Sequence, residues 1–301
     1  MTAALLCPGQ GAQAPGMGRD FFNAYGVASR IYESADKALG FPLSRLCFEG
    51  PEEELKLTAN TQPAILTHSV AAFEDLRARF PERLEGAVVA AGHSLGEYSA
   101  NVAAGALAFS DAVRLVRERG RFMQEAVPAG VGAMAAIVGL APAEVEAACR
   151  EAAQGESVSP ANYNSPEQTV IAGHAGAVER ASQGCLARGA KRAIPLPVSA
   201  PFHCALMSPA RERLRPLLEA AAFSEARIPV VTNVDAAPVT DGRALRDALV
   251  RQVDSPVRWV ESVQRLARDG VDRGLEIGPG NVLAGLVRRI EKGIKVEGYA
   301  G

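Results

Sequence analysis

Aromatic side chains, histidine and cysteine are scarce in this sequence of 301 residues. Phe, Trp and Tyr make up 5% of it, and it holds four His and five Cys. The histidines lie far apart and no HExxH is present, so we expect no metal site. The cysteines are odd in number and dispersed, with no CxxC pair, which is typical of reduced thiols in the cytoplasm. They are Cys7, Cys47, Cys149, Cys185 and Cys204.

The sequence also lacks the patterns of export and of membrane insertion. Its first residues, MTAALLCPGQG, have no basic stretch before a long apolar run, so they do not resemble a signal peptide. The nearly apolar stretch 131–143 is interrupted by Gly and Pro and is too short to span a bilayer. We therefore expect a cytoplasmic protein that binds no membrane.

An excess of charge of either sign is missing as well. The formal net charge is −2, so no overall field attracts nucleic acid, and we expect no nucleic-acid partner. A local basic patch is compatible with that total. Hydrophobic residues reach 48% and charged residues 22%, which is typical of a globular protein with one large domain or two modest ones.

Strand and helix patterns alternate along the chain, which is typical of an α/β protein. Short apolar runs predict strands at 3–7, 87–91, 229–232 and 274–277. The continuous run at 87–91 predicts a strand buried on both faces. Helical spacing predicts helices at 21–39, 63–80, 95–105 and 111–126, and around Trp259 and Val287.

The segment 132–196 has a different order of elements. It predicts a strand at 133–138, a helix at 142–153, strands at 157–163 and 169–172, a helix at 176–188 and a strand at 191–196. This βαββαβ order is that of a ferredoxin-like unit. Pro and Gly mark both of its ends. We predict a small subdomain of residues 130–197 inserted into a catalytic core of residues 1–129 and 198–301.

A candidate nucleophile is Ser94, within Gly92-His93-Ser94-Leu95-Gly96. This GxSxG lies between a predicted buried strand and a predicted helix, the context of a nucleophile elbow. Amides and the helix dipole at such a turn favour a developing oxyanion. A plain helix N-cap serine is the alternative, and the strand-to-helix context favours the nucleophile.

The best-placed base is His203, which follows the point where the predicted insert rejoins the core. A loop there is suited to cover a cleft between domains. A buried structural histidine fits the sequence equally well. His68 lies in a helical pattern, His93 lies inside the elbow itself, and His174 lies at a turn, so these three are poorer candidates.

An arginine interrupts an apolar helical stripe. Arg119 shares its stripe with Ala112, Leu115, Phe122 and Ala126, whereas Arg114, Arg117 and Arg121 lie on a polar face with Glu118 and Glu125. An arginine in an apolar stripe needs a buried anion. A structural acid and a substrate carboxylate, held bidentately by the guanidinium, both satisfy that need.

A glycine-rich loop follows the first predicted strand. Gly9, Gly11 and Ala14 loosely match GxGxxG/A, but a dinucleotide site needs a second strand ending in an acid about 20 residues on. Residues 21–39 have helical spacing instead. We therefore interpret the loop as a tight turn that presents the backbone N–H of Gln10 to a shared site.

Together these segments resemble the malonyl-CoA:acyl carrier protein transacylase family. The motifs in the family's order are PGQGAQ, GHSLGEYSA, Arg-Gly-x-x-Met-Gln from Arg119, ANYNSP, PFHC, SPVRW and EIGPG, and they span nearly the whole chain. The resemblance implies an α/β-hydrolase-like core with a ferredoxin-like insert. It also implies transfer of malonyl from malonyl-CoA to the phosphopantetheine thiol of acyl carrier protein by a ping-pong mechanism, the step that supplies fatty acid synthesis.

The resemblance also assigns roles to individual residues. Ser94 corresponds to the acylated serine and His203 to its base, oriented by the backbone carbonyl of Gln252 rather than by an acid. The amides of Gln10 and Leu95 correspond to the oxyanion hole. The substrate-binding residues are Arg119, which would hold the malonate carboxylate, and Phe202, which is typical of malonyl-selective members where methylmalonyl-selective relatives show Tyr-Ala-Ser-His.

The resemblance further implies that no cofactor is needed, because malonyl-CoA is a substrate, and we expect the chain to act as a monomer. Three alternatives share the same chemistry: acyl transfer for polyketide synthesis, acyl transfer for malonate decarboxylation, and hydrolysis of malonyl-CoA by a thioesterase. A fourth, non-catalytic alternative is a docking module in a synthase assembly.

Overall fold

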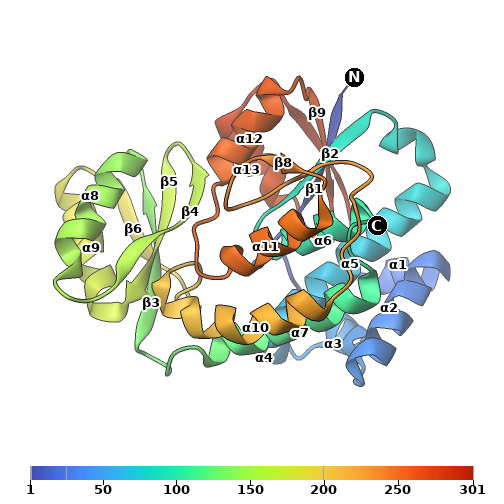
Figure 1. The fold of residues 1–301 in the computed structure, drawn as a ribbon, viewed down its shortest axis with the longest axis horizontal. Coiled ribbons are helices and arrows are strands. Elements are labelled where there is room, and N and C mark those ends of the chain that lie inside the picture. The colour runs from blue at the N-terminus through green and yellow to red at the C-terminus, as the bar shows by residue number, and fades with distance from the viewer. Residues whose placement is uncertain (1, 25, 199, 301) are drawn as a thin grey trace.

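A computed structural model describes residues 2–24, 26–198 and 200–300, arranged around two sheets (Figure 1). The six-stranded sheet has the order β10-β9-β1-β2-β7-β8. Its strands are β1 (Ala3–Cys7), β2 (Ala87–Gly92), β7 (Val230–Val231), β8 (Pro238–Val239), β9 (Arg273–Ile277) and β10 (Lys295–Tyr299). Neighbouring strands pair in parallel except β7 and β8, which form an antiparallel edge.

Alternate side chains of the central strands enter two separate cores. Leu5 and Ala90 belong to a core shared with α1 (Arg19–Ala24), α2 (Gly26–Leu39), α3 (Leu43–Glu49), α4 (Glu52–Leu55), α5 (Thr58–Arg79), α6 (Gly96–Ala103), α7 (Phe109–Glu125), α10 (Ser208–Ala220) and α11 (Gly242–Gln252). Leu6 and Ala91 point the opposite way, into a core shared with α12 (Trp259–Arg268) and α13 (Val282–Ile290). Both faces of the sheet are therefore covered, as parallel sheets require.

The strand predicted at 87–91 is buried along only part of its length. Val88 is 46% exposed, and the strand is buried from Val89 onward. The cause is a register shift, because Ala3 pairs with Ala87 while Ala4 pairs with Val89. Val88 is the extra residue of this bulge and points out of the sheet.

The second sheet is antiparallel and forms a separate lobe beside the core (Figure 1). It contains β3 (Gly132–Val138), β4 (Val158–Ser165), β5 (Gln168–His174) and β6 (Arg192–Pro195) in the order β4-β5-β3-β6. The helices α8 (Pro142–Ala153) and α9 (Ala175–Ala187) pack on one face. This is the ferredoxin-like arrangement, so the predicted fold class is confirmed. The domain limits at 129/130 and 197/198 stay a prediction.

The opposite face of the small sheet contacts the segment that carries the candidate base. Met134 and Ala136 of β3 pack with Cys204, and Val198 and Phe202 lie against the same cluster. A backbone bridge joins the two parts nearby: the N–H of Tyr163 donates to the carbonyl of Val257 at 3.0 Å, and the N–H of Val257 donates to the carbonyl of Ala161 at 2.9 Å. The insert is therefore attached to the core at the site as well as through its two ends.

The helix predicted at 63–80 begins earlier, at Thr58, and Pro63 lies inside it. Proline has no N–H, so the carbonyl of Ala59 loses its usual partner four residues on. Arg117 of α7 donates to that carbonyl at 2.8 Å. Arg117 is therefore only partly on the solvated face predicted for it, because it completes the hydrogen bonding of a neighbouring helix.

The helix predicted at 21–39 is formed by two helices, α1 and α2, and Tyr25, within that prediction, lies outside the described residues. The predictions around 95–105 and 111–126 correspond to α6 and α7. The two regions predicted around Trp259 and Val287 are α12 and α13. Two short 3₁₀ turns, Pro81–Leu84 and Ala205–Met207, complete the described structure.

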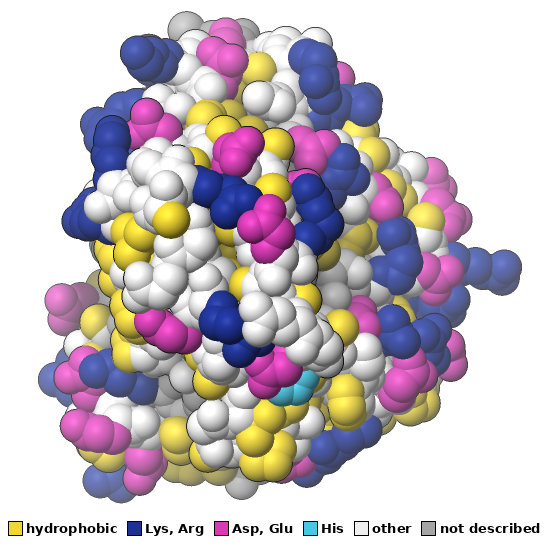
Figure 2. Space-filling model, turned by 90° about the vertical axis from the view of Figure 1, so that its left-hand side faces the viewer, with side chains coloured by type: hydrophobic (Ala, Val, Ile, Leu, Met, Phe, Trp, Pro, Cys, Tyr) yellow, Lys and Arg dark blue, Asp and Glu magenta, His cyan; other side chains and the backbone are white. Residues whose placement is uncertain are grey.

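Charges of both signs are interspersed on the end of the molecule formed by the small subdomain (Figure 2). Arg180 pairs with Glu156 at 2.7 Å and Arg188 pairs with Glu151 at 2.5 Å in this subdomain. This face therefore has no field of a single sign. No helix within residues 2–24, 26–198 and 200–300 is long and apolar enough to cross a bilayer.

Candidate active site

The sequence around Ser94 forms a tight strand-to-helix turn. Strand β2 ends at Gly92, α6 begins at Gly96, and Ser94 between them has a φ of +52°, a conformation that costs free energy for a residue with a side chain. A Cβ on Gly92 would lie 2.0 Å from the backbone of Gly96, and one on Gly96 would lie 2.0 Å from the carbonyl oxygen of Cys7. Both glycines are required for this close approach, which is that of a nucleophile elbow.

His203 lies against Ser94, as predicted. The distance between Ser94 Oγ and His203 Nε2 is 2.7 Å, and that between His203 Nδ1 and the backbone oxygen of Gln252 is 2.9 Å. A carbonyl oxygen only accepts, so Nδ1 carries the proton and Nε2 is left to accept from the serine hydroxyl. Burial, and then the nearby Arg119 charge, lowers the pKa of His203 to about 3. The imidazole is therefore neutral and able to take a proton at neutral pH.

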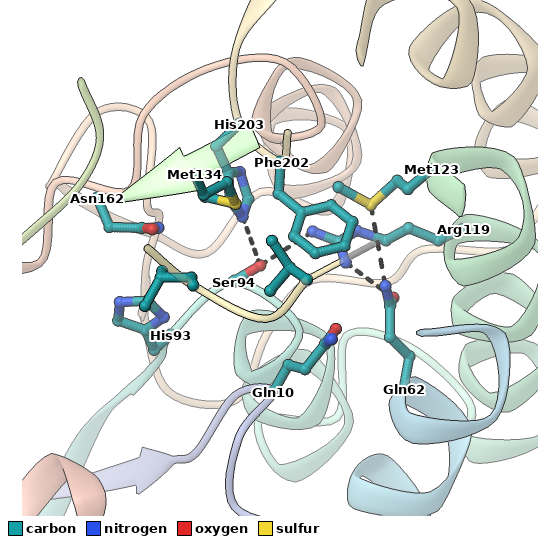
Figure 3. A pocket seen from close by; sticks show the side chains of 12 residues that line it. Gln10, Gln62, His93, Ser94, Arg119, Met123, Met134, Asn162, Phe202 and His203 are labelled. Atoms are coloured by element: carbon teal, nitrogen blue, oxygen red, sulfur yellow. Dashed lines mark hydrogen bonds between the residues drawn. The ribbon is translucent and has the colours of Figure 1, made fainter. Parts of the chain in front are cut away.

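Arg119 extends from α7 to the same hydroxyl and is only 1% exposed (Figure 3). Its Nη2 donates to Ser94 Oγ at 3.1 Å and to Gln252 Oε1 at 2.8 Å, while its Nη1 donates to Gln62 Oε1 at 2.8 Å. These partners are neutral, and no acidic side chain of the described residues forms an ion pair with it. Burial lowers the pKa of the guanidinium. Glu97 acts on the guanidinium through space and raises its pKa, but it forms no ion pair with it. A buried cation whose hydrogen-bond partners are neutral is suited to bind an anionic ligand.

The loops after β1 and β2 lie together at the carboxyl ends of these parallel strands, where α/β proteins form their sites. The N–H of His93 donates to the carbonyl of Cys7 at 3.1 Å, which joins the two loops. The backbone N–H groups of Gln10 and Leu95 have no hydrogen-bond acceptor among the described residues. These amides are available to an oxyanion near Ser94, as the resemblance implies.

A cavity with an empty volume of about 570 Å³ opens over these groups. Ser94 lies at its centre, with His203 and Arg119 pointing toward its hydroxyl from different sides (Figure 3). Much of the remaining wall is apolar and is formed by Met123, Met134, Leu196, Val198 and Phe202. The polar residues Gln10, Gln62, His93 and Asn162 complete the lining.

The sequence did not predict that three further polar residues belong to the site. Gln62 of α5 holds Arg119, and Glu97 of α6 and Asn233 form a buried cluster behind Ser94 with Gln252. Asn233 follows the predicted strand at 229–232, so the rule that sites gather at the carboxyl ends of strands would have identified it. Gln62 and Glu97 lie in helical patterns, where no sequence signal separates them from surface residues.

His68 and His174 do not line the cavity, and His93 lines it without reaching the Ser94 hydroxyl. Nε2 of His93 is 2.8 Å from Asn164 Oδ1, and no hydrogen bond joins His93 to the Ser94 hydroxyl. His68 is buried in α5, with Nδ1 3.0 Å from Tyr32 Oη. His174 ends β5, and its Nδ1 accepts from the N–H of Ser157. The dinucleotide interpretation fails here too, because helices follow β1 and the next strand along the chain is β2.

In the described part of the chain, no group of three or more His, Cys, Asp or Glu side chains is arranged to hold a metal ion. The five cysteines are free and buried.

Comparison with known proteins places this geometry in a family. The model of the acyl transferase domain matches residues 4–300. The malonyl CoA-acyl carrier protein transacylase of Escherichia coli K12 is 53% identical over 287 residues, which cover 95% of this chain and 92% of that protein.

Solved structures agree with this match. An acyl carrier protein S-malonyltransferase from Vibrio cholerae has a TM-score of 0.95 at 49% identity and covers 99% of this chain and 96% of its own. A malonyl-transacylase in complex with a type II polyketide synthase acyl carrier protein has a TM-score of 0.96 at 48% identity, and the match covers 100% of this chain and 96% of that chain. The chain with the Ser94, His203 and Arg119 cluster therefore belongs to the malonyl CoA-acyl carrier protein transacylase family of acyl transferases.

Proposed function

We propose that the protein transfers a malonyl group from malonyl-CoA to the phosphopantetheine thiol of acyl carrier protein, with Ser94 as the nucleophile. The observation that carries this proposal is the buried guanidinium of Arg119, which lies 3.1 Å from Ser94 Oγ without an acidic partner among the described residues. A malonyl group esterified to Ser94 would place its free carboxylate against that cation. An acetyl group would leave the guanidinium without an anion, which favours malonyl as the substrate.

The first half of the reaction acylates the enzyme. Nε2 of His203 takes the hydroxyl proton while Ser94 Oγ forms a bond to the thioester carbonyl carbon. The tetrahedral oxyanion accepts from the amides of Gln10 and Leu95, at roughly 3 kcal/mol per donor in comparable sites. The carbon–sulfur bond then breaks, the imidazolium returns its proton, and coenzyme A leaves as a thiol.

The second half reverses the roles of the groups. The carrier thiol gives its proton to His203, and its sulfur attacks the malonyl-serine ester carbonyl. The ester carbon–oxygen bond breaks, and Ser94 Oγ recovers a proton from the imidazolium. The Gln252 carbonyl keeps the ring oriented through both halves by accepting from Nδ1 at 2.9 Å. These steps use protein side chains and backbone alone, so the proposed mechanism needs no cofactor.

Selectivity against a branched acyl group is assigned to Phe202. Its ring lines the cavity next to Ser94, on the side from which Arg119 extends (Figure 3). A methyl group on the α-carbon of malonate would compete with this ring for the space in front of the serine. The apolar wall also limits the water that could attack the acyl-serine, which favours transfer over the thioesterase alternative.

The cellular setting belongs to the same proposal. We propose that the carrier serves fatty acid synthesis, that the reaction occurs in the cytoplasm and that the chain acts as a monomer. The free, buried cysteines are compatible with a reducing compartment. Carrier proteins of fatty acid and polyketide synthesis present the same thiol, so the two pathways differ in the partner and not in the chemistry.

Intact-mass analysis after mixing with malonyl-CoA tests the proposal. The protein should gain one malonyl group, and addition of holo acyl carrier protein should remove it from the enzyme and place it on the carrier. Ser94→Ala should gain nothing. A malonyl adduct on Ser94→Ala would contradict the nucleophile assignment. Rapid loss of the adduct as free malonate without the carrier would favour the thioesterase.

A further inference from the structure

A buried carboxylate lies directly behind the nucleophile. Glu97, in the first turn of α6, has no exposed surface. Its Oε2 accepts from Gln252 Nε2 at 2.7 Å and from the backbone N–H of Asn233 at 3.0 Å. Neither Glu97 oxygen forms an ion pair with a cation of the described residues, and Oε1 has no hydrogen-bond partner among them. Burying an acid without a paired cation costs free energy, and burial raises the pKa of Glu97 to about 7. The mechanism above leaves this residue unexplained.

The Gln252 side chain connects this carboxylate to Arg119. Its Nε2 donates to Glu97 Oε2, and its Oε1 accepts from Arg119 Nη2 at 2.8 Å. Oε2 of Glu97 accepts both in the charged acid and in the neutral acid that carries its proton on Oε1, and a guanidinium only donates. The amide between them therefore satisfies both groups in one orientation alone. If the amide turned over, Oε1 would face the carboxylate and the NH₂ group would face the guanidinium. Glu97, together with the backbone carbonyl of Ser94, therefore fixes which end of the amide is presented to Arg119.

The same cluster holds the strained peptide of the nucleophile on both sides. Gln252 Nε2 also donates to the carbonyl of Ser94 at 2.9 Å, and Asn233 Oδ1 accepts from the N–H of Ser94 at 2.7 Å. Asn233 is fixed in turn by Glu97 through its backbone N–H. A residue at a φ of +52° keeps that conformation only when its surroundings fix it, and both fixing groups meet at Glu97 Oε2.

We propose that Glu97 is a positioning residue for malonyl transfer: its carboxylate orients the Gln252 amide, which holds Arg119 where the substrate carboxylate binds and Ser94 where it attacks. This inference rests on the proposed function, because it assumes that Arg119 binds malonate. It adds a negative group that never touches the substrate yet sets the preference for it. A polarised chain of hydrogen bonds then runs from carboxylate to amide to guanidinium.

The test measures acylation of the enzyme by malonyl-CoA and by acetyl-CoA, as kcat/KM for each, in Glu97→Ala and Glu97→Gln. Without an acceptor at position 97, only the Ser94 carbonyl and Arg119 hold the Gln252 amide, which can then shift from the position that supports Arg119. Glu97→Ala should therefore lose roughly tenfold or more of the malonyl-over-acetyl preference. Glu97→Gln keeps an oxygen at Oε2 and should retain most of the preference. The control is Glu276→Gln, which alters another fully buried carboxylate that caps α13 away from the cavity.

A purely structural role for Glu97 predicts a different result. In that case Glu97→Ala would melt at a lower temperature, as Glu276→Gln should, and its malonyl-over-acetyl preference would equal that of the unaltered protein. That outcome would overturn the proposal. The unaltered protein acts as the reference for the proposed function itself, since failure to form a malonyl adduct would refute malonyl transfer before Glu97 is considered.

A second variant decides the matter if Glu97→Ala does not fold. Gln252→Met keeps the length of the side chain and the backbone carbonyl that orients His203, but it removes the amide. It should lose about the same preference as Glu97→Ala. Glu97→Met, which removes the acceptor but keeps the side-chain length, should change nothing further in that background. Additive losses in the double variant would show that the two residues act independently and would contradict the chain of hydrogen bonds.

Discussion

The cavity has two walls of opposite character. The wall behind Ser94 is polar and comes from the core, with Arg119, Gln252, Glu97 and Asn233 joined by hydrogen bonds. The wall in front is apolar and comes mainly from the insert and the segment that follows it: Met134, Leu196, Val198 and Phe202, with Met123 of α7 beside them. The core thus supplies charge and hydrogen bonds, while the other wall supplies shape and excludes water, which strengthens the charges behind it.

The largest effect is expected at the polar wall. Arg119→Ala should lower kcat/KM for malonyl-CoA by about 100-fold, because a buried charge-assisted pair with the substrate carboxylate is lost. Acetyl-CoA should be affected much less, since it carries no carboxylate. Stopped-flow or intact-mass acylation with both substrates measures the difference.

The matched control for Arg119 is Arg121→Ala on the same helix. Arg121 is exposed and pairs with Glu118 and Glu125 on the surface. Surface pairs contribute little, so its acylation rates should be those of the unaltered protein. Equal losses with malonyl-CoA and acetyl-CoA in Arg119→Ala would remove the carboxylate role from Arg119 and would mean that the polar wall only shapes the cavity.

An intermediate effect is expected at the apolar wall. Phe202→Ala should raise acylation by methylmalonyl-CoA relative to malonyl-CoA by roughly tenfold, because the space of one phenyl ring accommodates the additional methyl group. The preference for malonyl over acetyl should stay, since the polar wall is intact. The control is Phe109→Ala, a half-buried ring at the start of α7 that does not line the cavity.

The opposite pattern in Phe202→Ala would contradict the division of roles between the walls. If this variant lost the malonyl-over-acetyl preference and gained no methylmalonyl transfer, the ring would act on Arg119 and not on the shape of the acyl site.

The smallest effect on the acylation rate is expected from lowering the pH. Burial and Arg119 hold the pKa of His203 at about 3, so the base stays neutral from pH 8 to about pH 5. Glu97, whose pKa burial raises to about 7, changes charge in this window, so single-turnover acylation should stay flat in Glu97→Gln. A fall with a midpoint near 6.5 in that variant would refute the environment of His203. In Arg119→Ala, one of the causes of the shift is gone, so the acid limb should move to higher pH.

Stability should respond to acid in a definite direction. Between about pH 6.5 and pH 3 the unfolded chain binds a proton on His203 that the folded chain excludes. The contribution of His203 to the free energy of unfolding should therefore decrease as the pH falls through this window. Glu97, whose pKa is raised to about 7, contributes in the opposite direction, so the effect of His203 is the difference in slope between the unaltered protein and His203→Gln. Urea unfolding at several pH values measures both slopes.

The sequence predicted the parts of the site that local patterns encode. The elbow at Ser94 needs glycines on both sides within five residues, and the arginine at position 119 breaks an apolar stripe within one helix. Both signals are short-range. The contact of His203 with Ser94 joins residues far apart along the chain, so the residue pattern alone left a structural histidine open until the family resemblance assigned the role.

The rest of the site depends on contacts that no local pattern contains. Glu97 has the spacing of an ordinary helix residue, and its burial follows from the packing of α6 against Asn233 and Gln252. The start of α5 at Thr58 was missed because Pro63 is typical of a helix start. Arg117, which donates to the backbone carbonyl that Pro63 leaves without a helical partner, lies on another helix.

The bridge between Val257 and strand β4 has a mechanical consequence. Only residues 253–256 separate Val257 from Gln252, whose carbonyl orients the imidazole. A rotation of the insert against the core would therefore pull on the chain that keeps the base aligned, or would first have to break the bridge. Movement of the insert away from the core and alignment of His203 are therefore coupled through residues 253–256. The cavity between them could widen only as far as this short stretch of backbone can extend.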